Sequence, residues 1–258
     1  MDFEKMKKIT CFGICSILIG LVLSSGQVTA DVIKFDNFVY PDGSLVPNGG
    51  WANHSGTAGD LQVVNEQVVV QHGTPSEDAN LGFAAVAGNI YYGLDFSVSA
   101  TGQILGTDNE YFAHFRNAFD FSARLDVVPA LGGGDYTVGI ASDDSVADAI
   151  WATDLTFETT YRAVVRYDQD ANIAELWIDA ALSTDTSILG DDQADPGDSV
   201  NSFALRQSDS DLNETVIVDN LVVGTTFEDV VSGVVIPEPA SGIVLLVFAT
   251  CLFVRRRR

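Results

Sequence analysis

The feature that most constrains this chain is a two-residue alternation of apolar and polar side chains, repeated in many short stretches. In residues 92–100, for example, Leu94, Phe96 and Val98 alternate with smaller or polar residues. Successive side chains of a β-strand point to opposite faces, so this spacing favours half-buried strands. No interior stretch shows the 3.6-residue spacing of a convincing amphipathic helix. The sequence therefore predicts an all-β fold.

Turn-forming residues separate the expected strands, and a hairpin loop is expected at residues 168–172. About a dozen short strands favour one antiparallel sandwich over an immunoglobulin-type domain, which has fewer. A long acidic loop is expected at residues 183–198. The expected strands are residues 62–64, 67–70, 92–100, 111–116, 121–127, 136–141, 154–157, 162–167, 173–178, 202–207 and 216–223.

The first 30 residues have the three parts of a secretory signal peptide. Lys5, Lys7 and Lys8 give a basic start, residues 9–23 are apolar and uncharged, and Val28-Thr29-Ala30 offers small residues for cleavage. A retained N-terminal anchor is the alternative, although the apolar run is short for a membrane span. Residues 1–30 are therefore expected to direct export, and the mature chain to start at Asp31.

The exported part is strongly acidic. Residues 31–236 hold 33 acidic residues (36 less Asp2, Glu4 and Glu238) and six basic ones (13 less three lysines and four arginines of the two ends). The resulting charge of about −27 disfavours nucleic acid and anionic lipid, which bind basic patches. Cys11, Cys15 and Cys251 all fall in the terminal segments. The core is therefore expected to be stabilised by packing, without disulfides.

The C-terminal end combines two prolines, a short apolar run and a cluster of arginines. Pro237, Glu238 and Pro239 precede an apolar run over residues 240–254, and the chain closes on Arg255, Arg256, Arg257 and Arg258. As a helix the run is about 22 Å long, against a hydrocarbon core of roughly 30 Å. The arginines can extend to the interface and stop transfer. Residues 232–258 are therefore expected to be a sorting segment with a short transmembrane helix.

This arrangement resembles the PEP-CTERM sorting signal of Gram-negative bacteria. The resemblance implies an exosortase as a processing partner, transient anchoring in the inner membrane, and delivery to the cell surface or extracellular matrix.

A second resemblance covers most of residues 31–231. It rests on the order of residues 161–168, 174–178, 202–207 and 218–230, and on the opening Phe35-Asp36-Asn37-Phe38. The stretch is similar to concanavalin A-like ectodomains of the laminin-G and lectin/glucanase type. This likeness implies a jelly-roll sandwich in which the first and last strands lie close together. Since that fold hosts lectins, glycosidases and adhesion modules alike, it leaves the activity open.

The acid and base residues do not form a catalytic pattern. Glucanases of this fold carry Glu-x-Asp-x-x-Glu on one strand, and no such run occurs here. Glu175 lies in the middle of a predicted strand and is expected to point outward. His114 is expected to be a packed or hydrogen-bonded histidine. The sequence therefore favours a non-enzymatic protein.

Two kinds of binding site have candidate residues. Calcium prefers several carboxylate or carbonyl oxygens, and the acidic loop offers Asp191, Asp192, Asp195 and Asp198. A solvated loop is the alternative, and no other cofactor is indicated. Glycans stack on exposed aromatic side chains, for which Trp51, Tyr91 and Trp151 are candidates. Trp177 is expected in the core.

Together these features predict an exported, surface-directed β-sandwich with a structural or adhesive role in an exopolysaccharide matrix. Two alternatives remain: a lectin-like carbohydrate-binding module, and a glycoside hydrolase of the same fold.

Overall fold

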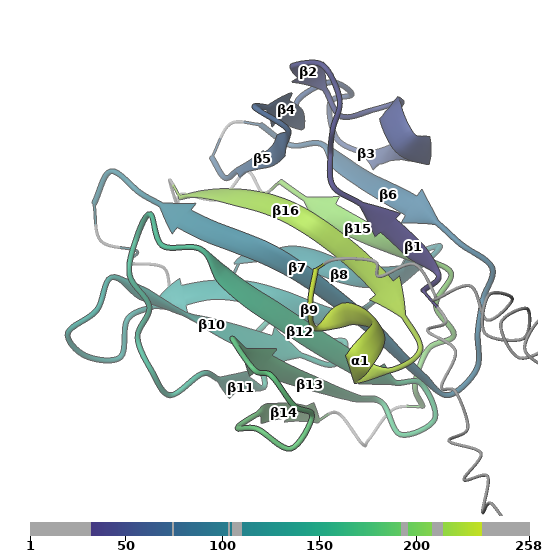
Figure 1. Cartoon of the computed structure of the whole chain (residues 1–258), viewed down its shortest axis with the longest axis vertical. Coiled ribbons are helices and arrows are strands. Elements are labelled where there is room, and N and C mark those ends of the chain that lie inside the picture. Colours follow the sequence, from purple (N-terminus) through teal and green to yellow (C-terminus); the bar gives the residue numbers. More distant parts are fainter. Residues whose placement is uncertain are drawn as a thin grey trace, which may run out of the picture.

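The structure, a computed structural model, describes residues 32–73, 75–102, 104, 110–191, 196–207 and 214–233. These residues form two antiparallel sheets, A and B, packed face to face (Figure 1). The predicted all-β antiparallel sandwich is therefore confirmed. Within the described ranges, no helix has the length and apolar character needed to cross a bilayer.

Sheet A has nine strands among the described residues, in the order β14-β13-β12-β7-β16-β5-β4-β2, with β1 also paired to β16. Their bounds are β1 Lys34–Asp36, β2 Gly43–Ser44, β4 Gln62–Val64, β5 Gln67–Gln71, β7 Asn89–Ser99, β12 Tyr161–Asp168, β13 Ile173–Ile178, β14 Ile188–Asp191 and β16 Thr215–Gly224.

Sheet B has seven strands among the described residues, in the order β11-β10-β9-β8-β15-β6-β3. Their bounds are β3 Trp51–Ser55, β6 Asp78–Gly82, β8 Glu110–Asn117, β9 Asp120–Pro129, β10 Tyr136–Ala141, β11 Ala149–Ile150 and β15 Ser202–Arg206. A 3₁₀ turn over Asn48–Gly50 and the short helix α1 over Phe227–Val230 complete the described elements.

The core lies between the sheets, where the alternation of β7 places Leu94, Phe96 and Val98 on the buried face as expected. Tyr92 of the same strand contacts Phe115 of β8 and Phe203 of β15, with ring centroids 5.1 and 5.0 Å apart. Its hydroxyl donates to the carbonyl of Ala123, at 2.9 Å. Burial of such large rings is the main source of stability in a domain without disulfides.

The ends of the sandwich meet as predicted, because β1 pairs with β16 through Lys34–Val223, Phe35–Val222 and Asp36–Leu221. Two predictions were wrong. Residues 154–157 form a single bridge between Leu155 and Tyr136 in place of a strand. The acidic loop contains the edge strand β14.

The short helix α1 lies on one part of the outer face of sheet A, the face turned away from sheet B, against β16, β7 and β12 (Figure 1). Under the helix lies a second apolar cluster formed by Val164, Trp177, Val222, Phe227 and Val230, which confirms that Trp177 is buried. A capping box starts the helix: the Thr226 hydroxyl accepts from the Asp229 N–H, and the Asp229 carboxylate accepts from the Thr226 N–H.

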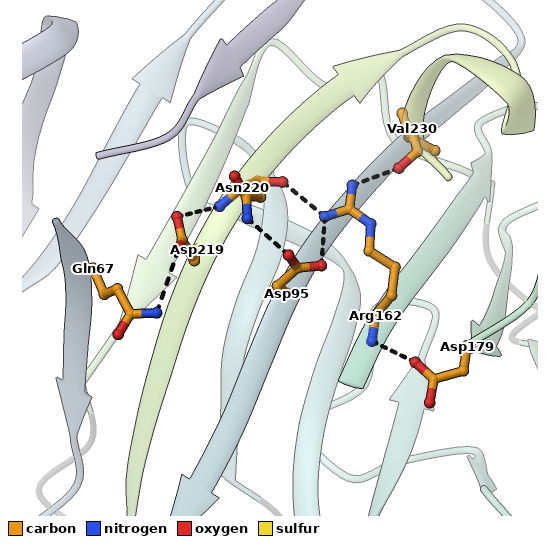
Figure 2. Close-up of polar contacts among 7 residues, drawn as sticks. All are labelled: Gln67, Asp95, Arg162, Asp179, Asp219, Asn220 and Val230. Atoms are coloured by element: carbon orange, nitrogen blue, oxygen red, sulfur yellow. Dashed lines mark hydrogen bonds and ion pairs between the residues drawn. The ribbon is translucent and has the colours of Figure 1, made fainter. Parts of the chain in front are cut away.

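Arg162 of β12 fastens this helix to the sheet (Figure 2). Its guanidinium donates to Asp95 at 3.0 Å, to the Asn220 carbonyl at 2.8 Å and to the Val230 carbonyl. Gly93 provides the space, since a Cβ there would lie 2.7 Å from the guanidinium. The network therefore links three strands and α1 and explains a bulge in β16 between Asp219 and Val222, where Asn220 turns toward Asp95.

Candidate functional site

The outer face of sheet B is concave, as one contact between distant strands shows. His54 of β3 and Phe121 of β9 approach with ring centroids 6.5 Å apart. Three strands, β6, β15 and β8, separate β3 from β9 in the sheet. At about 4.8 Å per strand, a flat sheet would place the two strands roughly 19 Å apart. The sheet therefore curves toward this face, and we refer to its concave surface between β3 and β9 as the trough.

Four aromatic rings cross the trough in a row. We call them the ring row: Tyr111, His114, Phe121 and His54. Tyr111 and Phe121 each meet His114 edge to face, with centroids 5.2 and 5.1 Å away. Tyr111, Phe121 and His54 are partly exposed, whereas His114 is only 1% exposed beneath them. Next to His114 in the sheet register lies a small residue, Ala204 of β15, and beyond it Asn80 of β6.

Three arginines surround the ring row: Arg116, Arg124 and Arg206. The guanidinium carbon of Arg124 lies 5.0 Å from the Tyr111 ring centre and 5.8 Å from that of Phe121. Arg206 stacks on Tyr111 at 4.3 Å. Such cation–π contacts are favourable, because the face of an aromatic ring attracts a cation. Three of the six basic residues of the acidic exported part therefore gather on one face.

His114 has unused hydrogen-bonding capacity at the centre of this face. Burial lowers the pKa of His114 well below its usual value, and Arg124, His54 and Arg206 lower it further. The imidazole is therefore neutral at pH 7, with one donor and one acceptor nitrogen. Within the described residues neither nitrogen has a hydrogen-bond partner. A buried polar group without a partner costs about 1–3 kcal/mol, so such groups usually mark a site for water or a ligand.

Asp78 of β6 closes one end of the trough, opposite Arg206 in the sheet register. Burial raises the pKa of Asp78 to about 6, although Arg206 and Arg116 oppose the shift. Its carboxyl is therefore neutral in mildly acidic solution, where the face carries its largest positive charge.

This shift gives a pH dependence of stability that a single substitution can isolate. Because the folded pKa of Asp78 lies above its unfolded value, the protonated carboxyl favours folding, and that contribution is lost as pH rises through about 6. We expect Asp78→Asn to match the wild type at pH 4 and to be more stable by about 2 kcal/mol at pH 7, after discounting for solvent screening. Denaturant unfolding at both pH values measures this, and a constant difference would contradict it.

The aromatic residues proposed from sequence do not come together. Trp51 is 2% exposed, and its indole N–H donates to Asp36 at 2.8 Å, so it belongs to the core and cannot stack on a sugar. Tyr91 lies beside the apolar cluster on sheet A. Trp151 follows β11, at the edge of sheet B opposite β3, and packs partly against the core.

The proposed calcium ligands are only partly covered. Asp191 ends β14, and Asp198 accepts from the Ser122 hydroxyl of β9 at 3.3 Å. Asp192 and Asp195 lie outside the described residues. In the part of the chain that the structure describes, no three acidic, histidine or cysteine side chains form a group able to hold a metal ion.

The remaining predictions concern Glu175, His114 and the sorting residues. Glu175 points outward from β13 and pairs with Arg166 at 2.8 Å, as an alternating strand predicts. His114 is packed, as expected, but on the outer face. The sorting residues lie outside the described ranges: Pro237, Glu238, Pro239, Arg255, Arg256, Arg257 and Arg258.

Comparisons with known proteins bear on the fold. Neither family models nor curated protein sequences match this sequence. Among solved structures, a sialidase matches with a TM-score of 0.51 and 12% identity over 78% of this chain. The match shows the fold alone. The chain spans 19% of that sialidase's length.

Two further structures match at lower similarity. A Lotus tetragonolobus seed lectin matches with a TM-score of 0.47 and 12% identity, over 76% of this chain and 98% of the lectin. An alginate lyase of Polysaccharide Lyase family 7 matches with a TM-score of 0.45 and 12% identity, over 65% of this chain and 82% of the lyase.

Proposed function

We propose that this protein is an exported module that binds polysaccharide through the concave face of sheet B. The observation that carries the proposal is the ring row with its three arginines, built over the neutral, unpartnered imidazole of His114. Sugar hydroxyls both donate and accept hydrogen bonds, which suits an imidazole with one donor and one acceptor nitrogen.

A ligand can reach His114 only after a small movement of the side chains that lie above it. Phe121 and His54 lie above it and are only partly buried. Rotamer changes of such surface side chains are fast, so a sugar ring can replace the His54–Phe121 contact. Phe121 and Tyr111 then offer apolar ring surface to the sugar, while Arg116, Arg124 and Asn80 offer donors.

Export and sorting belong to the same proposal and rest on the sequence. The signal-like residues 1–30 and the PEP-CTERM-like residues 232–258 favour processing by an exosortase and residence at the cell surface or in an exopolysaccharide matrix. A binding face for polysaccharide is consistent with that destination.

We infer a binding role without catalysis. The concave face presents Asp78 of β6 and Asp126 of β9, and the sequence lacks the Glu-x-Asp-x-x-Glu run that places the carboxyls of retaining glucanases about 5 Å apart on one strand. A glycoside hydrolase would show hydrolysis that is lost when either acid is replaced.

Replacing Phe121 tests directly whether polysaccharide binds to the concave face of sheet B. We expect Phe121→Ser to weaken binding to a polysaccharide panel at least tenfold, because the sugar loses a ring to pack on. Phe119→Ser is the matched control: Phe119 is 90% exposed at the β8–β9 turn and outside the ring row. Affinity electrophoresis of the full chain measures both. Equal losses in both variants, or no loss in either, would contradict the proposal.

A further inference from the structure

Irregularities in β8 and β9 bring the ring row to one face of the sheet. In a regular strand, residues three apart point to opposite faces. Tyr111 and His114 of β8 nevertheless contact each other on the concave face, and Phe121 and Arg124 of β9 do the same. The register of the β8–β9 pair shifts twice, on either side of Ala113. Such bulges change the face on which the following side chains lie.

The irregularity in β9 is centred on Ala123. Its φ is 53°, in the left-handed region that residues with a Cβ rarely adopt. The Ala123 N–H donates to the Ser142 carbonyl at 2.7 Å, and the Ala123 carbonyl accepts from the Tyr92 hydroxyl at 2.9 Å. Strained backbone persists only where its surroundings hold it, and it clusters at functional sites. The fold therefore maintains an unfavourable conformation that places Phe121 and Arg124 on the same face.

Arg124 contacts the two partly exposed six-membered rings of the ring row. Its Nε–H donates to the Phe121 carbonyl at 3.1 Å. Its guanidinium carbon lies 5.0 Å from the centre of the Tyr111 ring and 5.8 Å from that of the Phe121 ring. A planar guanidinium can stack on an aromatic face, whereas the ammonium of a lysine is a compact point charge. One side chain thus joins the rings on either side of His114.

We propose that Arg124 is a positioning residue for polysaccharide binding: it holds Phe121 and Tyr111 in the arrangement on which sugar rings pack. This inference rests on the proposed polysaccharide-binding function, and it gives Arg124 a role that goes beyond offering donors. Rings that are fixed before a ligand arrives lose less conformational entropy when it binds. The affinity of the face for sugar therefore depends on a side chain that acts through its neighbours.

The positioning role requires no free positive charge on the concave face. Asp78 of β6 lies opposite Arg206 in the sheet register, and Asp126 of β9 lies opposite Tyr111, so acids and arginines share this face. The contacts of Arg124 are made to rings and to a backbone carbonyl of the protein itself. The effect of replacing Arg124 is therefore expected with an uncharged polysaccharide and in high salt, where contacts between exposed charges are screened.

Two substitutions at Arg124 separate position from charge. Arg124→Lys keeps the charge and loses the planar group with its Nε–H, whereas Arg124→Met loses both. We expect each to weaken binding of the full chain to an uncharged polysaccharide by about tenfold, measured by affinity electrophoresis in high salt. Arg166→Met is the matched control: Arg166 pairs with Glu175 on sheet A, so this variant should bind as tightly as the wild type.

Ring contacts in the ligand-free protein give a second measurement, which a direct contact between Arg124 and sugar would leave unchanged. The ring centres of Tyr111 and Phe121 lie 5.2 and 5.1 Å from that of His114, close enough for nuclear Overhauser effects between their protons. We expect these signals to weaken in Arg124→Met and to persist in Arg166→Met.

The outcomes separate this inference from the function on which it rests. Wild-type affinity in Arg124→Lys, or unchanged ring signals in Arg124→Met, would overturn the positioning role and leave polysaccharide binding intact. Failure of the wild-type chain to bind any polysaccharide of the panel would overturn both. Melting curves establish that each variant is folded, and if Arg124→Met is not, the affinity of Arg124→Lys decides.

Discussion

Replacing Arg162 by methionine is expected to lower the free energy of unfolding by about 3 kcal/mol. The Arg162 side chain is 11% exposed and bonds Asp95 and the carbonyls of Asn220 and Val230. Methionine fills similar space without donors, so the Asp95 carboxylate loses its ion pair and two carbonyls lose a donor. Denaturant unfolding of the full chain measures the loss.

A second arginine on the same strand is the control. Arg166 makes one ion pair, with Glu175, and both side chains are more accessible to water than Arg162. We expect Arg166→Met to cost about 1 kcal/mol or less. A loss at Arg162 no larger than this would mean that the network in Figure 2 does not hold α1 on the sheet.

Removal of Arg255, Arg256, Arg257 and Arg258 is expected to give the largest effect in cells, an all-or-none loss of processing. The proposed sorting signal needs its apolar run stopped in the membrane so that Pro237, Glu238 and Pro239 stay at the membrane surface. We expect the deletion, and Glu238→Ala, to leave unprocessed protein in the inner-membrane fraction.

The control for this experiment is an acidic residue outside the signal. Glu228→Ala alters α1 and leaves residues 236–258 unchanged, so processing should proceed normally. Cell fractionation with immunoblotting follows the size and location of each variant. Normal release of the arginine deletion would contradict the stop-transfer role of these residues.

The central strands could be predicted from sequence because their side chains alternate clearly. Residues 92–98 and 162–167 are buried on one face and contribute to the core as expected. Strand β6 could not be predicted in this way. The β6 sequence Asp-Ala-Asn-Leu-Gly has few residues that favour strands, and pairing on both sides, with β15 and β3, determines its conformation.

The candidate site was missed because its residues are scattered along the chain. His54, Arg116 and Arg206 are on separate strands, and only the strand order and the curvature of sheet B bring them to one face. Each residue alone suggests a packed or solvated side chain. One signal was present in the sequence: five of only six basic residues in the acidic exported part lie within predicted strands, at residues 116, 124, 162, 166 and 206.

Trp51 was predicted to contact sugars, but it lies in the core, and the sequence alone could not show this. Aromatic residues suit both cores and sugar sites, and the sequence does not show that Asp36 accepts the indole N–H. The aromatic side chains proposed here, Tyr111 and Phe121, differ in carrying arginines on their faces.

Hydroxyl-radical footprinting of the full chain, with and without a saturating amount of the polysaccharide in the panel that it binds most tightly, tests the central claim most directly. The method reports solvent access to individual aromatic side chains. We expect protection of Tyr111 and Phe121 on the concave face, with Tyr91 and Trp151 unchanged. Protection of Tyr91 or Trp151, with Tyr111 and Phe121 unchanged, would place the polysaccharide elsewhere and contradict this claim.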